Sequence, residues 1–91
     1  MKLLHVNGHR IVLARSGGAY FAFSDRCTHR GGSLAGGVMV GGAVHCLWHG
    51  SQFEAASGAV RCGPAGKPIR TFEVRQLDDG RLLLMAPPPG V

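Results

Sequence analysis

The stretch CTHRGGSLAGGVMVGGAVHCLWHG, residues 27–50, contains two cysteine–histidine pairs separated by a glycine-rich interval. Cys27 and His29 form the first pair, C-x-H, and Cys46 and His49 form the second, C-x-x-H. Each spacing fits a single turn, so both side chains of a pair can point to the same side of one loop. Thiolate and imidazole together suit zinc or iron–sulfur centres. The stretch therefore predicts a metal site assembled from two loops.

The way the ligand types are distributed distinguishes these two kinds of centre. Zinc-finger sequences usually carry two cysteines on one arm and two histidines on the other. Here each arm carries one of each, which a 2Fe–2S cluster needs when one iron binds both cysteines and the other iron both histidines. We therefore favour an iron–sulfur site, with structural zinc as the alternative.

The rest of the chain consists of short apolar segments separated by glycine-containing turns. The predicted strands are residues 2–6, 10–15, 19–23, 38–40, 43–46, 52–54, 59–61, 69–76 and 81–86. Asn7 and Gly8 form the strongest hairpin signal, because both turn positions favour positive φ. No amphipathic helix of useful length is evident. The pattern predicts an all-β fold, a small antiparallel sandwich or barrel.

Composition limits the classes of partner. The 91 residues make one small domain, whose core benefits from a metal, a disulfide or a partner. The net charge is +5, with ten Lys and Arg against five Asp and Glu. The arginines are scattered along the chain and are not interleaved with aromatic residues. This pattern disfavours nucleic acid as a partner and fits an acidic protein.

The sequence predicts a cytoplasmic protein that does not enter a membrane. No secretory signal is visible at the N-terminus, and the longest apolar stretch, residues 82–86, is too short to cross a bilayer. An odd cysteine count argues against a disulfide framework. Cys62 has no partner at a useful spacing, and we expect a small buried apolar side chain there.

The chain resembles a known family from about residue 11 to residue 84, most of its length. Two segments carry most of this resemblance. CTHRGGSL (residues 27–34) and CLWHGSQFE (residues 46–54) resemble the two cluster loops of Rieske-type 2Fe–2S ferredoxins. GPA (residues 63–65) and the strand after it resemble the family's closing segment. The resemblance implies a Rieske domain over residues 1–86, with a cluster-binding subdomain at one end and a flexible proline-rich tail at 87–91.

The resemblance also implies the cofactor and its ligands. One 2Fe–2S cluster is expected, with Cys27 and Cys46 on one iron and His29 and His49 on the outer iron. Ser51 is expected to donate a hydrogen bond to a bridging sulfide, and Trp48 to shield the loop from solvent. We expect the potential to fall as pH rises, because reduction holds the protons of the two imidazoles more tightly.

Departures from the high-potential members of the family indicate the branch. Those members join the two loops by a disulfide, whereas this chain has Gly32 and Trp48 at the corresponding positions. Phe53 stands where they have a tyrosine, which removes a hydrogen bond to sulfur. Fewer such bonds lower the potential within the Rieske range of roughly −150 to +300 mV. The chain thus resembles the ferredoxins of ring-hydroxylating dioxygenases.

The function implied is that of a soluble, monomeric one-electron carrier rather than an enzyme. It would pass electrons from a flavoprotein ferredoxin reductase to a terminal oxygenase or similar acceptor. The chain has no G-x-G-x-x-G fingerprint and no second iron site of its own. Arg26 and Arg30 flank the first loop, either to orient an acidic partner or stabilise the reduced cluster, or as solvated charges. The alternatives are a Rieske domain or small subunit of a larger oxidoreductase, and a zinc-stabilised binding module.

Overall fold

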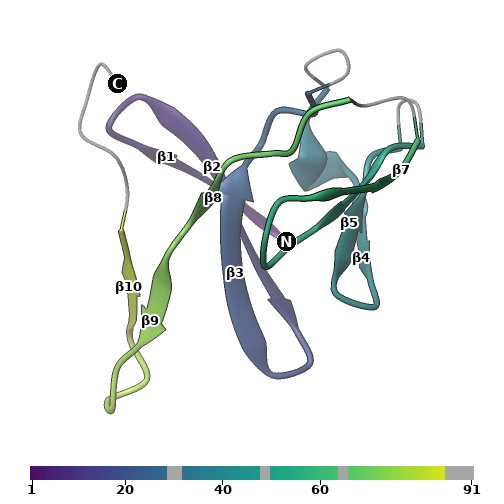
Figure 1. Ribbon diagram of the computed structural model, residues 1–91. Helices are drawn as coiled ribbons and strands as arrows, with labels where there is room; N and C mark the ends of the chain where they lie inside the picture. Colours follow the sequence, from purple (N-terminus) through teal and green to yellow (C-terminus); the bar gives the residue numbers. More distant parts are fainter. Residues whose placement is uncertain (29–31, 48–49, 64–65, 86–91) are drawn as a thin grey trace.

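A computed structural model describes residues 1–28, 32–47, 50–63 and 66–85 (Figure 1). Its strands are β1 (Lys2–Val6), β2 (His9–Ser16), β3 (Ala19–Ser24), β4 (Val38–Val40), β5 (Ala43–His45), β6 (Gln52–Glu54), β7 (Val60–Cys62), β8 (Thr71–Phe72), β9 (Val74–Gln76) and β10 (Leu82–Leu84). The only helical element in these residues is the 3₁₀ turn η1 (Leu34–Gly36). None of the described residues forms a helix with the length and apolarity of a membrane span.

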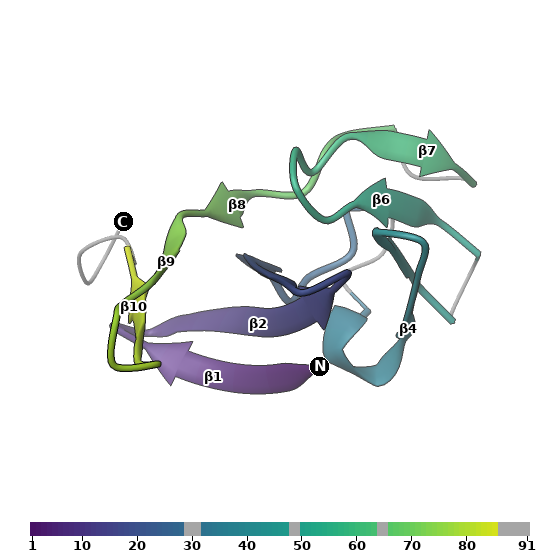
Figure 2. The same ribbon diagram turned by 90° about the horizontal axis from the view of Figure 1, so that it is seen from below.

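The strands form two antiparallel sheets and a separate hairpin. The first sheet has the order β1-β2-β3-β8, the second has the order β4-β5-β6-β7, and β9 pairs with β10. The chain leaves the first sheet after β3, builds the whole second sheet, and then returns as β8. Figures 1 and 2 show the β9–β10 hairpin and the second sheet on opposite sides of the β1–β3 strands. The all-β prediction is confirmed.

Tight turns set the register of the hairpins, as the sequence predicts. Asn7 and Gly8 have φ values of 52° and 82°, and the flanking residues Val6 and His9 pair directly. Gly41 and Gly42 have φ values of 56° and 78° between β4 and β5. Two consecutive positive φ angles are what the two-residue hairpin turn requires.

The predicted strand over residues 69–76 is two strands with different partners. Phe72 of β8 pairs with Ala22 of β3, whereas Val74 of β9 pairs with Leu84 of β10. Glu73 lies between them, where the chain changes from the first sheet to the hairpin. The alternation of apolar and polar residues cannot reveal this change of partner, because it continues unchanged from β8 into β9. Of the predicted last strand, Ala86 lies outside the described residues, as does the tail 87–91.

The hydrophobic core draws residues from both four-stranded sheets. Val12 of β2 and Phe23 of β3 are fully buried, as are Val44 of β5 and Phe53 of β6. These four side chains belong to one cluster, which also contains the candidate ligands Cys27 and Cys46. The candidate thiols are therefore part of the core that joins the two sheets.

Candidate metal centre

Two backbone loops of equal length begin at the two candidate cysteine ligands. In the first loop (residues 27–32), the Cys27 N–H donates to the Gly32 carbonyl at 2.8 Å. In the second loop (residues 46–51), the Cys46 N–H donates to the Ser51 carbonyl, also at 2.8 Å. Each loop is thus closed on itself by the backbone of its own cysteine.

Strand-like pairs close the base of both loops. Arg26 and Ser33 form an isolated antiparallel bridge below the first loop. His45 and Gln52 pair below the second, at the end of β5 and the start of β6. A paired base fixes the direction in which each cysteine enters its loop, so the two sites are held in the same local way.

Three residues of the candidate site are buried. Cys27 is 2% exposed, Cys46 is 1% exposed and Ser51 is fully buried. Neither cysteine forms a disulfide. Buried, unbridged thiols that are shielded from solvent by the core can serve as thiolate ligands once a cation compensates their charge.

Only part of the predicted site lies within the described residues. Cys27, Cys46 and Ser51 are described, whereas His29, Trp48 and His49 are not. The ligand roles of the two cysteines and two histidines, the hydrogen bond from Ser51 and the shielding role of Trp48 all stay predictions.

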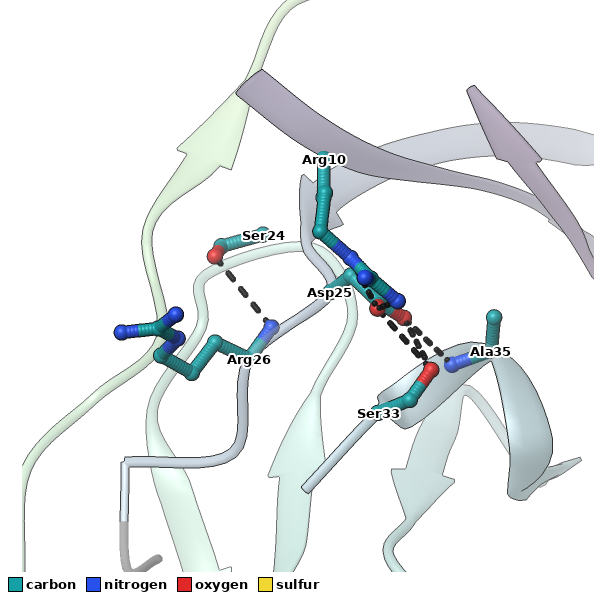
Figure 3. Close-up of polar contacts among 6 residues, drawn as sticks. All are labelled: Arg10, Ser24, Asp25, Arg26, Ser33 and Ala35. Atoms are coloured by element: carbon teal, nitrogen blue, oxygen red, sulfur yellow. Dashed lines mark hydrogen bonds and ion pairs between the residues drawn. The ribbon is translucent and has the colours of Figure 1, made fainter. Parts of the chain in front are cut away.

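Asp25 anchors the entry and exit of the first loop to the body of the domain (Figure 3). Its carboxylate accepts hydrogen bonds from Arg10 Nε at 3.1 Å and Arg10 Nη2 at 2.8 Å. Ser33 Oγ lies 2.8 and 2.9 Å from the two carboxylate oxygens, and the Ala35 N–H donates to Oδ1 at 2.8 Å. Asp25 is 2% exposed, so these donors replace the water that a buried charge would otherwise need. One side chain therefore connects β2, both ends of the first loop and η1.

The segment between β7 and β8 contacts both loops. Thr28 Oγ1 donates to the Lys67 carbonyl at 2.6 Å, which joins this segment to the first loop. Gly63 has a φ of 97°, and a Cβ placed there would lie only 2.5 Å from Ser51 Cα. The backbone of Gly63 thus packs directly on the second loop, a contact that only glycine permits.

The expectation that Cys62 is a buried apolar residue is wrong. Cys62 is exposed at the end of β7. β7 is an edge strand of the second sheet, and of its residues only Val60 packs against the core. The spacing of Cys62 from the other cysteines gave no information on this point.

Asp25 is not among the candidate site residues predicted from the sequence. One signal was present: Asp25 is one of only five acidic residues, and it stands between an apolar strand and the candidate ligand Cys27. An acid at such a position requires a partner, but nothing in the sequence indicates that Arg10 supplies it.

Comparisons with known proteins identify the family and the fold. The family model described as Rieske [2Fe-2S] domain matches residues 1–73. A Ralstonia sp protein named "Naphthalene 1,2-dioxygenase/salicylate 5-hydroxylase systems, ferredoxin component" is 30% identical over 79 residues, which cover 87% of this chain and 75% of that protein. The biphenyl 2,3-dioxygenase ferredoxin component of Rhodococcus jostii (strain RHA1) is 33% identical over 73 residues, covering 80% of this chain and 68% of that protein.

Solved structures and larger relatives complete the comparison. The ferredoxin of carbazole 1,9a-dioxygenase from Nocardioides aromaticivorans IC177 superimposes with a TM-score of 0.85 at 26% identity, covering 97% of this chain and 83% of that one. The match to protein TIC 55 of Pisum sativum, at 36% identity, covers 79% of this chain but only 15% of that protein. The same domain type thus stands alone in some proteins and forms a small part of others.

Proposed function

The chain belongs to the Rieske [2Fe-2S] domain family, and we propose that it holds one 2Fe–2S cluster and carries single electrons between protein partners. The observation that carries this proposal is the pair of equal, self-closed loops that each begin with a buried, unbridged cysteine. When bound, the cluster supplies reversible one-electron redox chemistry.

The residues present fit this cofactor. Cys27 and Cys46 would bind the inner iron through thiolates on the core side, and His29 and His49 would bind the outer iron. Ser51 is buried directly beside the second loop's closing bond, where its hydroxyl can support the sulfur side of the site. The core shields the thiolates from water, and the Asp25 and Gly63 contacts hold the loops that carry them.

The partners proposed are a flavoprotein ferredoxin reductase and a terminal oxygenase. Several relatives are named as ferredoxin components of dioxygenase systems, and one similar structure is titled as a complex of reduced oxygenase and oxidized ferredoxin. That complex chain superimposes with a TM-score of 0.83 at 28% identity. The chain itself performs no substrate chemistry, and it acts as a monomer in the cytoplasm.

The test is the metal content and spectrum of the purified protein. We expect two irons and two acid-labile sulfides per chain, and a rhombic EPR signal after reduction by dithionite. Cys46→Ala should abolish the visible absorption, whereas Cys62→Ala, which changes an exposed cysteine, should leave it intact. Stoichiometric zinc without sulfide, after anaerobic reconstitution with iron and sulfide, would refute the proposal.

A second candidate is a Rieske domain within a larger oxidoreductase. It is favoured by the matches that cover only 15% of TIC 55 and 12% of the mouse protein named apoptosis-inducing factor 3. The cluster and its ligands would be the same, but the electron acceptor would be on the same polypeptide. The mass of the native gene product separates the two candidates, since the carrier requires a product of about the length of this chain.

A further inference from the structure

A cavity of about 340 Å³ opens at the base of the first loop. Its walls include three arginines from separate parts of the chain, Arg10, Arg26 and Arg70, together with Asp25, Ser33 and Phe72. Figure 3 shows Arg10 and Ser33 on either side of the Asp25 carboxylate, with Arg26 on the neighbouring turn of chain. The Arg26–Ser33 bridge that closes the first loop is therefore also part of the cavity wall.

The charges around this cavity do not cancel. The Asp25 carboxylate is already bound by Arg10, Ser33 and the Ala35 N–H, and its side chain is 3% exposed. Within the described residues, no carboxylate lies at ion-pair distance from Arg26 or Arg70. The acids Glu54, Glu73 and Asp79 instead pair with Arg61, Arg75 and Arg81 away from the cavity. The cavity thus carries a net positive charge.

Two of the three guanidinium groups are held in place. Arg10 makes two hydrogen bonds to Asp25 while its side chain remains 55% exposed, so part of the group still faces solvent. The Arg70 guanidinium lies over the Phe72 ring, 5.2 Å from its centroid. Guanidinium groups that are fixed before binding lose less rotamer entropy when they bind a carboxylate.

We infer that this cavity receives a carboxylate side chain from an acidic segment of the redox partner. The inference rests on the proposed function and adds the place and chemistry of docking. Arg26 directly precedes Cys27, so a partner segment in the cavity lies beside the first loop. Guanidinium groups bind carboxylates by paired, charge-assisted hydrogen bonds, which set orientation as well as affinity.

An acidic protein segment fits this site better than nucleic acid. Nucleic-acid grooves combine an extended track of cations with several aromatic platforms. Phe72 is the only Phe, Tyr or Trp among the described lining residues of this cavity, and its ring is already covered by Arg70. A single carboxylate entering between Arg26 and Arg70 satisfies the charges without such a track.

The test measures binding of an acetylated hexaglutamate peptide that carries a far-red dye. Fluorescence anisotropy of the peptide is titrated with the cluster-loaded protein at low ionic strength, where exposed charges are least screened. Arg26→Gln and Arg70→Gln should each weaken binding by about fivefold, and both together by more. Arg26→Lys should retain part of the affinity, because it keeps the charge but loses the planar donor pair.

Arg15→Gln is the matched control. Arg15 lies at the opposite end of β2 from Arg10, stacked over Tyr20, and has no carboxylate partner among the described residues. Its replacement changes the net charge by the same amount as Arg26→Gln. It should therefore alter the peptide affinity by less than about twofold, as expected for a screened charge far from the site.

Several results would overturn the inference. Equal weakening by all three glutamine variants would indicate attraction to net charge alone. An absence of peptide binding at low salt would show that the cavity does not receive a carboxylate. Competition by free glutarate at peptide-like concentrations would assign the cavity to a small anion. Tighter binding of a labelled DNA oligonucleotide with the same variant profile would assign it to nucleic acid.

The visible spectrum of each sample keeps the two proposals separate. Absence of a cluster after reconstitution refutes the proposed carrier, whatever the peptide does. A loaded cluster with no difference between Arg26→Gln and Arg15→Gln refutes only the docking site. Thermal unfolding of each variant identifies any loss of binding that comes from loss of fold.

Discussion

At the scale of single residues, Asp25 holds the first loop in position and is not itself a candidate ligand of the cofactor. Its carboxylate accepts five described contacts from four donor groups of Arg10, Ser33 and Ala35, and is almost completely removed from solvent. Removing a donor from a buried charge is destabilising, because the charge then lacks compensation. The residue therefore fixes the position of the first loop through its neighbours, without contacting the candidate ligands in any described interaction.

Asp25→Asn should destabilise the domain more than the loss of an exposed ion pair does. The amide keeps the shape but leaves Arg10 without its counter-charge, and its NH2 group must face either Arg10 or the Ala35 N–H, each of which needs an acceptor. Because Arg10 is partly solvated, we expect a loss of about 1–3 kcal/mol in the free energy of unfolding, measured in urea. Asp79→Asn, which weakens the exposed pair with Arg81, should cost less than about 1 kcal/mol. An equal loss in the free energy of unfolding for the two variants would show that the Asp25 contacts contribute little to stability.

Gly63→Ala should disturb the second loop specifically. An alanine Cβ would lie 2.5 Å from Ser51 Cα and 2.8 Å from the Gly50 carbonyl, and the φ of 97° is strained for any side chain. The loop must move, so we expect lower cluster content after reconstitution and a shifted visible spectrum. Gly66→Ala is the control, because a Cβ there meets no atom within 4 Å. A normal spectrum for Gly63→Ala would contradict the packing described here.

At the scale of elements, three segments form the candidate site: the first loop, the second loop and the segment between β7 and β8. The first two are closed by their own cysteine N–H groups, whereas residues 66–70 are held to the first loop by the Thr28–Lys67 hydrogen bond. The same segment is also held by the Ile69 N–H, which donates to the Gly58 carbonyl at 2.9 Å. Each bond attaches the segment at a different point along its length.

Thr28→Val should loosen this segment with little effect on the sheets. Valine is close to threonine in size but cannot donate to the Lys67 carbonyl. We expect a cost of about 0.5–1.5 kcal/mol. Hydrogen–deuterium exchange should be faster at amides near Lys67 but unchanged in β2 and β3. The Ile69 N–H provides an internal reference, since its bond to Gly58 does not involve Thr28. Uniform acceleration would point instead to a global loss of stability.

Elements that depend on neighbouring residues were predictable from the sequence, and elements that depend on distant ones were not. The Asn7–Gly8 turn requires only a local preference for positive φ, and the structure has it. The division of residues 69–76 depends on which strand lies beside each half, which is a tertiary choice. The cysteine pairs were visible because they are close in sequence, whereas the Asp25–Arg10 contact joins residues 15 positions apart.

At the scale of the whole molecule, the two sheets are unequal. The strands β1, β2 and β3 have 5, 8 and 6 residues, whereas β4, β5, β6 and β7 have 3 each. Short strands gain little from their own ladders and depend on the packing between sheets. Cys27 and Cys46 lie in that shared core, so whatever binds the thiols also holds the second sheet against the first.

Removal of the cluster should therefore destabilise the molecule unevenly. A cofactor that binds only the folded state adds its binding free energy to stability, so Tm should fall by roughly 10 °C or more on conversion to the apoprotein. Hydrogen–deuterium exchange of the apoprotein should accelerate mainly in β4, β5, β6 and β7, while β2 and β3 keep most of their protection. The reconstituted protein is the control and should recover both Tm and the exchange pattern. Equal loss of protection in both sheets would show that the domain unfolds as one unit, and an unchanged Tm would show that the buried thiols need no cofactor to hold the second sheet.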